Sequence, residues 1–212
     1  MIGIRQVNIK ATVMKKLLLL LGIPFVLLVI FVMMAVGSYN GLIGKSQAVD
    51  AQWAQVENVY QRRADLVPNL VATVSGAADF EKSTLMEVTN ARAKVGQMQL
   101  PAGAPTDAAQ LAKFEAAQAQ LGSSLSRLLV TVERYPQITA TASFRDLQAQ
   151  LEGTENRIAV ERGKFNTVVQ GYNVAIKRIP AVFIAGALGY ETRTYFTAKP
   201  GAEEPPQVDF GN

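Results

Sequence analysis

The sequence predicts an all-α protein with a single N-terminal transmembrane helix followed by an elongated antiparallel bundle of about four helices. Three observations favour this fold class: an uncharged apolar run near the N-terminus, apolar residues spaced by three and four along the rest, and no segment that alternates like a strand. The chain therefore divides into a basic segment, a transmembrane helix, a helical bundle and a disordered tail rich in Pro, Gly and acid, at residues 1–16, 17–36, 39–196 and 197–212.

The apolar run is LLLLLGIPFVLLVIFVMMAV, residues 17–36. As a helix it would be about 30 Å long, which matches the hydrocarbon core of a bilayer. A buried core helix is the first alternative, but the amphipathic remainder offers no shell thick enough to cover it. A cleaved signal peptide is the second, with AVG as its cleavage site, although secretory signals use only about 7–15 apolar residues. Without a Cys, the chain cannot be acylated as a lipoprotein.

The charges that flank this run predict its orientation. Arg5, Lys10, Lys15 and Lys16 precede it, whereas Lys45 is the only basic residue among the 25 that follow. The positive-inside rule then places the N-terminus in the cytoplasm and the bundle on the outer side of the bacterial inner membrane, with the opposite orientation as the alternative. Without those first four residues, the other 17 basic residues balance the 17 acidic ones, so the bundle has no basic face for nucleic acid.

Composition also excludes several types of catalytic and metal-binding site. The chain has no His and no Cys, which excludes Ser-His and Cys-His nucleophile pairs and the HExxH zinc site. No Walker A, GxGxxG or GxSxG motif is present, and the acidic residues are too scattered for a di-metal site. We therefore predict a protein that is not an enzyme, with no catalytic residue, no cofactor and no metal site.

Helical periodicity predicts four helices after the membrane span. The first continues directly from the span and buries Val49, Trp53, Val56, Tyr60, Ala64, Val67, Val71, Val74 and Ala78. The second covers about residues 80–98, after Asp79 as an N-cap. The loop LPAGAPTD then leads to the third helix, for which Thr106 or Asp107 can serve as the N-cap.

The third helix contains a heptad seam that ends at Pro136. The seam consists of Leu111, Phe114, Gln118, Leu121, Leu125, Leu128, Val132 and Tyr135, with Gln118 as its one polar member. In the fourth helix, Ser143 and Asp146 fit the spacing of a capping box. Its apolar residues are Phe144, Leu147, Leu151, Ile158, Phe165, Val168, Tyr172, Ile176 and Ile179. We expect Asn166, Tyr172 and Asn173 to form hydrogen bonds across the bundle.

The stretch RRADLVPNLV is unusual because it places a proline and charged residues inside an amphipathic helix. Its polar members and its proline are Arg62, Arg63, Asp65, Pro68 and Asn69. The apolar stripe keeps its spacing on both sides of the proline, so we expect a helix that continues through a kink rather than a helix end. A purely structural interpretation pairs either arginine with Asp65 at the surface, for a few tenths of a kcal/mol.

A second polar stretch, EGTENR, contains Glu152, Glu155 and Asn156 on the fourth helix. Charged groups in a seam between helices are costly unless they are paired. Our hypothesis is that Arg62 or Arg63 pairs with Glu152 or Glu155 and thereby fixes the register of the two helices.

The segment IPAVFIAGALGY, residues 179–190, is apolar but too short to span a bilayer. It could belong to the core, contact the membrane, or pack against another subunit. The candidate residues for a membrane or subunit contact are Phe183, Ile184, Leu188 and Tyr190.

Several of these blocks resemble the bacterial LemA family. The blocks are YNGLI, RRADLVPNLV, LSRLLVTVERYPQI, LEGTENRIAVER, FNTVVQGYN and FIAGALGY followed by YF, and they cover about residues 36–197 in order. The resemblance implies a single-pass membrane protein with a helical-bundle domain, and it implies no activity. It also implies a cytoplasmic bulk domain, which conflicts with the orientation expected from the charges.

Together, the residues and the resemblance favour a membrane-anchored scaffold or adaptor of the bacterial envelope without intrinsic catalysis. The expected partners are the lipid bilayer, further copies of the chain through the heptad seam or residues 179–190, and another envelope protein. The alternative is a regulator or partner of a membrane peptidase or other membrane enzyme.

Overall fold

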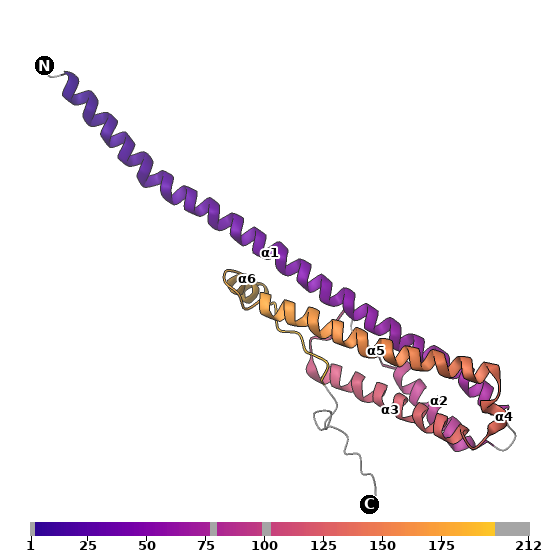
Figure 1. Ribbon diagram of the computed structural model, residues 1–212. Helices are drawn as coiled ribbons and strands as arrows, with labels where there is room; N and C mark the ends of the chain where they lie inside the picture. The colour runs from indigo at the N-terminus through magenta and orange to yellow at the C-terminus, as the bar shows by residue number, and fades with distance from the viewer. Residues whose placement is uncertain (1–2, 77–79, 99–102, 198–212) are drawn as a thin grey trace, which may run out of the picture. The chain divides into compact units, whose positions relative to one another are not determined.

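The computed structural model describes residues 3–76, 80–98 and 103–197, and the described residues form helices without a strand (Figure 1). The helices are α1 (Gly3–Ser75), α2 (Lys82–Gly96), α3 (Ala108–Val132), α4 (Pro136–Thr139), α5 (Ala142–Ala175) and α6 (Ala181–Leu188). This confirms the predicted all-α fold class. The predicted tail falls almost entirely outside the described residues.

The chain forms two compact units. The anchor unit consists of Met1–Lys45 with Val174–Glu191, and the bundle unit consists of Ser46–Asn173 with Thr192–Asn212. Helix α1 contributes to both units and is uninterrupted over its 73 residues. The first helix of the bundle is therefore, as predicted, a continuation of the apolar helix.

In the anchor unit, the apolar part of α1 is uncovered. The large hydrophobic side chains between Leu18 and Val36 are exposed by 42% to 70%. Within the described part of the chain, α1 is the one helix that is long and apolar enough to cross a membrane. Burying this surface in lipid would remove a large apolar area from water, at about 25 cal/mol per Å².

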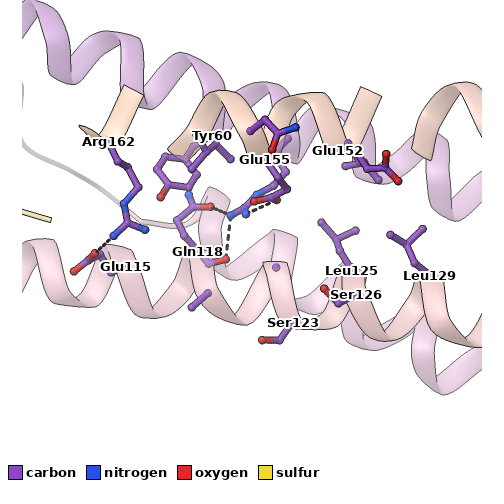
Figure 2. A pocket seen from close by; sticks show the side chains of 16 residues that line it. Tyr60, Glu115, Gln118, Ser123, Leu125, Ser126, Leu129, Glu152, Glu155 and Arg162 are labelled. Carbon is purple, nitrogen blue, oxygen red and sulfur yellow. Dashed lines mark hydrogen bonds and ion pairs between the residues drawn. The ribbon is translucent and has the colours of Figure 1, made fainter. Parts of the chain in front are cut away.

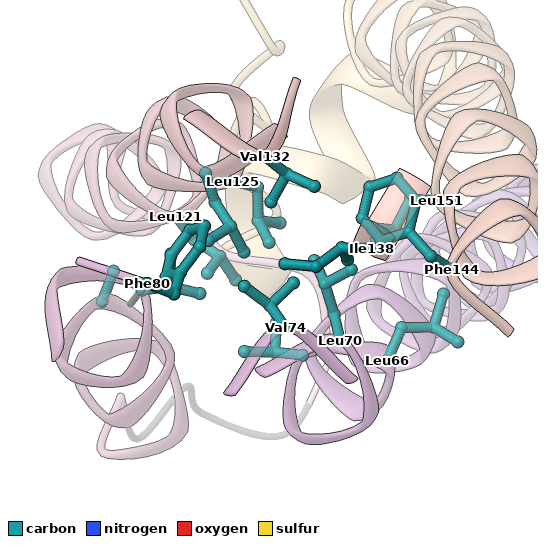
Figure 3. Close-up of a cluster of buried hydrophobic side chains, with 14 residues drawn as sticks. Leu66, Leu70, Val74, Phe80, Leu121, Leu125, Val132, Ile138, Phe144 and Leu151 are labelled. Carbon is teal, nitrogen blue, oxygen red and sulfur yellow. The ribbon is translucent and has the colours of Figure 1, made fainter. Parts of the chain in front are cut away.

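The bundle unit has a continuous hydrophobic core to which α1, α2, α3, α4 and α5 contribute (Figure 3). Its members include Leu66, Leu70, Val74, Phe80, Leu121, Leu125, Leu128, Val132, Ile138, Phe144 and Leu151. The heptad seam of α3 is buried as predicted from Leu111 to Val132, including the polar Gln118. The periodicity therefore identified the buried face of this helix correctly.

Several members of the predicted apolar stripes are not fully buried, and Val71, one of them, still packs against the core. On α1, Leu70 is fully buried and Val71 only partly, because the buried stripe turns around the helix. On α5, Val169 is buried in place of Val168. Helix α5 ends at Ala175, and Ile179 beyond it is 80% exposed. Ala78 and Asp79 lie outside the described residues.

The helix ends follow local capping chemistry. Asp107 accepts a hydrogen bond from the Ala109 N–H at 2.8 Å, as predicted for the N-cap of α3. The predicted capping box at Ser143 was wrong, because Thr141, two residues earlier, acts as the N-cap: its hydroxyl accepts a hydrogen bond from the Phe144 N–H. Pro136 does not end α3 directly, since α3 ends at Val132 and Pro136 occupies the first position of α4.

Candidate functional site

Among the described residues, Arg63 on α1 is the most strongly buried charged residue, with a relative exposure of 3%. Its Nη1 donates to the Glu155 carboxylate on α5 at 2.8 Å. Its Nη2 donates to both the backbone carbonyl and the side-chain oxygen of Gln118 on α3 (Figure 2). One guanidinium therefore bonds to groups from α3 and α5 at once, while its Nε–H has no partner among the described residues.

A second ion pair lies beside the first. Arg162 on α5 donates to Glu115 on α3 at 2.6 Å, and both side chains are partly buried. Burial raises the pKa of Glu115 above its ordinary value and outweighs the attraction of Arg162. Burial likewise raises the pKa of Tyr60, against the attraction of the nearby guanidinium groups, so this phenol is neutral at physiological pH.

These groups line a cavity of about 750 Å³ in the bundle unit (Figure 2). Its floor is apolar, with Leu125 and Leu129 from α3 and Leu151 from α5. Its rim carries Ser126 from α3 and Glu155 from α5. Because each arginine of the cavity is already paired with a carboxylate, the cavity has no free positive charge that would select an anion.

The predicted polar residues fall into two groups. Arg63 and Glu155 meet, which is one of the four pairings that the hypothesis allowed. Arg62 and Asn69 are exposed, as is Asp65, which accepts a hydrogen bond from Gln61 at 2.8 Å. Asp65 is therefore bonded to an amide one turn away, and the suggested surface pair of an arginine with Asp65 is absent among the described ion pairs.

The two remaining residues of EGTENR lie at the edge of the cavity. Glu152 is exposed and accepts a hydrogen bond from Gln148 of the same helix at 3.1 Å. Asn156 is exposed and lines the cavity. Neither residue is among those that bond to Arg63.

Pro68 lies inside α1, which continues to Ser75. Without an N–H, the proline leaves the Ala64 carbonyl, four residues earlier, without its usual helical partner. Arg92 of α2 donates its Nε–H to this carbonyl at 3.0 Å. The proline thus creates an acceptor on α1 that α2 uses, which supports the expectation that it does not end the helix.

Two asparagines of α5 hold an extended segment that follows α6. Asn173 donates to the Arg193 carbonyl and accepts from the Arg193 N–H, both at 2.8 Å. Asn166 forms the same pair of bonds with Phe196, both at 2.9 Å. Seven helical residues advance about 10.5 Å, and three extended residues advance about 10 Å, so the two spacings match. We call this arrangement the asparagine clamp.

Further contacts join the clamped segment to the rest of the bundle unit. Arg193 donates to the Ala104 carbonyl at 2.8 Å, and Asp50 on α1 accepts the Ala104 N–H at 3.1 Å. Phe196 is buried against Trp53 and Phe165, with ring centroids 5.9 Å and 5.3 Å apart. The extended segment therefore completes an aromatic cluster in the core.

Comparison with known proteins now identifies the family. A model of the LemA family matches residues 52–210, which is most of the chain and includes the Arg63 site, the proline and the clamp. The chain belongs to the LemA family. The resemblance inferred from the sequence blocks is thereby confirmed.

Relatives of this LemA protein include magnetosome proteins. Magnetosome protein MamQ of Magnetospirillum gryphiswaldense is 28% identical over 211 residues, which cover 90% of this chain and 77% of MamQ. Magnetosome proteins MamQ 1 and MamQ 2 of Paramagnetospirillum magneticum are each 26% identical over 204 residues, covering 88% of this chain and 74% of the relative. Family and relatives together indicate a membrane-associated protein.

Several residues of the LemA site were missed from the sequence. Glu115 and Arg162 form the second ion pair, and nothing in their spacing marks them as partners because they are 47 positions apart. Gln118 was a sequence sign of this site, because a polar residue in a buried heptad seam needs a hydrogen-bond partner. The backbone partners of Asn166 and Asn173 were also missed, since the expected bonds across the bundle were assigned no partner.

The described residues of this LemA protein also bear on metal binding and acid–base chemistry. Among the described residues, no group of three or more acidic side chains lies close enough to hold a metal ion. Hydrogen bonds from Lys164 and Gln52 hold the pKa of the partly buried Glu161 below its ordinary value, so this carboxylate is ionised near neutral pH and is a weaker base than an ordinary glutamate. The buried polar groups instead bond to one another between helices.

The asparagine clamp gives a prediction that amide exchange can test. Replacing Asn166 with alanine should accelerate hydrogen exchange at the Phe196 amide, and replacing Asn173 should do so at Arg193. Each substitution removes two hydrogen bonds and should lower the free energy of unfolding by about 1–3 kcal/mol. Replacing Asn166 with aspartate keeps the acceptor for the Phe196 N–H but sets a carboxylate oxygen against the Phe196 carbonyl, so protection there should fall between that of the alanine variant and that of the unaltered chain. Equal exchange at Phe196 in the alanine variant and the unaltered chain would contradict the clamp.

Proposed function

We propose that this LemA protein is a single-pass, membrane-anchored scaffold or adaptor of the bacterial envelope that self-associates and has no intrinsic catalysis. The observation that carries the proposal is the continuity of α1, in which the exposed apolar stretch and the buried stripe of the bundle are parts of one helix. The helix that would cross the membrane and the first helix of the bundle are therefore the same helix, with no linker between them.

The polar network supports the non-catalytic part of the proposal. A catalytic group has to be left accessible to a substrate, whereas Arg63 is almost completely buried and already bonded to two residues. The name magnetosome protein, given to the MamQ relatives, denotes a component of a cell structure and no reaction. We propose a corresponding role for this chain, as a component that binds further copies of itself and another envelope protein.

Self-association is tested with two differently tagged copies expressed in one cell. We expect one copy to co-purify with the other from detergent-solubilised membranes, and the complex to have a mass above that of one chain. The matched control expresses the copies in separate cells and mixes them after solubilisation, which measures exchange in the detergent. A single-chain mass together with no co-purification would rule out self-association.

The proposed orientation places the N-terminus in the cytoplasm and the bundle outside the inner membrane. Because the chain has no Cys, a single introduced cysteine can be labelled without background. A membrane-impermeant maleimide should label Ser126→Cys in intact spheroplasts and should label Gln6→Cys only after lysis. The reverse pattern would show that the bundle is cytoplasmic.

A further inference from the structure

Helix α6 has an apolar face that the described residues leave uncovered. Ala185 is buried, whereas Phe183 is 72% exposed, Leu188 is 55% exposed and Ile179, just before the helix, is 80% exposed. Ile184 and Tyr190, the two other residues predicted for a contact, are partly buried. Ala185 marks the packed side of α6, whereas Phe183 on the opposite side and Leu188 in its last turn are large apolar side chains that the described residues leave exposed.

The burial pattern of α1 indicates where along this helix α6 packs. Between Leu18 and Met34, the large apolar side chains are exposed, but Ala35 and Ser38 are partly buried and Leu42 is only 1% exposed. These three positions share one face of the helix. The anchor unit contains only residues 174–191 besides this part of α1, so we infer that the segment around α6 covers this face.

This location corresponds to the surface of the membrane. If the apolar run ends at Val36, Leu42 lies six residues or about 9 Å further along the helix. The headgroup region on each side of a bilayer is roughly 5–8 Å thick, from the difference between the full thickness and the hydrocarbon core. The covered face of α1, which begins at Ala35 and ends at Leu42, therefore crosses the headgroup region, and α6 would lie beside it where α1 leaves the lipid.

The charges beside the apolar face suit a lipid surface. Lys177 and Arg178 precede α6 and are exposed, and no acidic residue occurs between residues 174 and 190. Cations next to an apolar helical face are typical of helices that lie in the interface of anionic membranes. Two copies of this face brought together would place like charges side by side, which disfavours a second copy as the partner.

We propose that α6 is an interfacial membrane-contact helix: Ile179, Phe183 and Leu188 enter the boundary between headgroups and acyl chains, and Lys177 and Arg178 bind anionic lipid headgroups. This inference rests on the proposed membrane anchoring by α1. It gives the protein a second contact with the lipid bilayer, formed by residues near its C-terminal end.

The test uses the full chain reconstituted in vesicles of phosphatidylcholine and phosphatidylglycerol. An environment-sensitive fluorophore is attached to one introduced cysteine at a time: Phe183→Cys on α6, Ile30→Cys in the apolar run, and Val160→Cys on α5. Val160 is the matched control, since it is a hydrophobic residue of the bundle unit that is 54% exposed. Spin-labelled lipids then quench the fluorophore either at the headgroup or in the middle of the acyl chain.

We expect headgroup quenchers to reduce the emission of the Phe183 probe roughly twofold, with little effect of the deep quencher, as for a helix at the interface. The Ile30 probe should respond to the deep quencher and the Val160 probe to neither. Reversing the charges with Lys177→Glu and Arg178→Glu should weaken quenching of the Phe183 probe in vesicles that contain phosphatidylglycerol and leave it unchanged in pure phosphatidylcholine.

Each other outcome overturns the proposal in a distinguishable way. If the Phe183 probe behaves like the Val160 probe while the Ile30 probe is quenched, anchoring holds and the α6 contact is wrong. If the Phe183 probe is shielded from both lipid quenchers and aqueous iodide, a second copy covers this face. If the Ile30 probe is not quenched either, the membrane anchor itself is wrong, and the α6 contact is wrong with it.

Discussion

Replacing Trp53 with alanine is expected to lower the free energy of unfolding by about 3–5 kcal/mol, the usual cost of removing a large buried aromatic side chain. Trp53 is 1% exposed, and its ring lies 5.4 Å from Phe114 and 5.5 Å from Phe165, centroid to centroid. It also stacks on Phe196 of the clamped segment. The substitution therefore leaves a cavity between α1, α3, α5 and that segment.

Denaturant unfolding of the full chain in detergent, followed by far-UV circular dichroism, measures this loss. Trp53 is the only tryptophan, so its fluorescence cannot be used in the variant. The control is Trp53→Phe, which keeps an aromatic ring and removes the buried indole N–H, for which the described residues provide no partner. We expect this variant to lose much less stability, because the cost of burying that N–H disappears. Equal losses in both variants would contradict this account of the core.

Replacing Glu155 with glutamine is expected to lower the free energy of unfolding by about 1–3 kcal/mol. This is less than the full cost of breaking a buried ion pair, because the Glu155 side chain is partly exposed. The two partners differ greatly in side-chain exposure, 4% for Arg63 and 49% for Glu155. Loss of Glu155 leaves a buried guanidinium without its counter-charge. Loss of Arg63 leaves a carboxylate that water can still reach, so the cost of Arg63→Met comes instead from the buried Gln118 side chain, which loses its donor.

This asymmetry can be measured with a double-mutant cycle. Once Arg63 is methionine, the further change Glu155→Gln should have almost no effect, because the buried charge has gone. A matched control is the exposed pair Arg127–Glu87, in which Glu87→Gln should change stability by less than about 0.5 kcal/mol. If Glu155→Gln and Glu87→Gln lower the free energy of unfolding equally, Arg63 does not depend on its counter-charge. The hypothesis that the Arg63–Glu155 pair fixes the register of the two helices is then wrong.

The helices could be predicted from the sequence because their apolar residues recur with the helical period. The heptad seam of α3 is the clearest case, since every member of the seam from Leu111 to Val132 is buried, although the smaller Ala117, Ser124 and Thr131 beside it are buried too. The choice between Leu70 and Val71 on α1 was harder, because a step of three or four residues drifts relative to the true period of 3.6. Hydrophobicity does not distinguish two adjacent apolar residues.

The choice between Arg62 and Arg63 could have been made from the sequence. Arg63 follows Tyr60 by three positions and precedes Val67 by four, so it belongs to the buried stripe, whereas Arg62 is rotated by about 100° from it. The identity of its partner could not be deduced in the same way. Several carboxylates of α5 would fit the pattern, and only the packed register selects Glu155.

The clamped segment could not be predicted from periodicity. Residues 192–196 form no helix, and hydrogen bonds from side chains to backbone hold them at Arg193 and Phe196. Such bonds depend on the main chain of the bound segment and leave no pattern in its side chains. The only local sign was the spacing of seven between Asn166 and Asn173, which places both on one face of a helix.

The bond between Arg92 and Ala64 has a consequence for how related sequences can diverge. The carbonyl of Ala64 is an open acceptor only while position 68 is a proline. If a relative carries another residue there, its N–H closes the helical bond, and an arginine at the position of Arg92 loses this function. The two positions should therefore vary together among relatives, although Pro68 is exposed and its ring forms no part of the bond. Such covariation would be evidence of a contact that forms because the proline has no N–H.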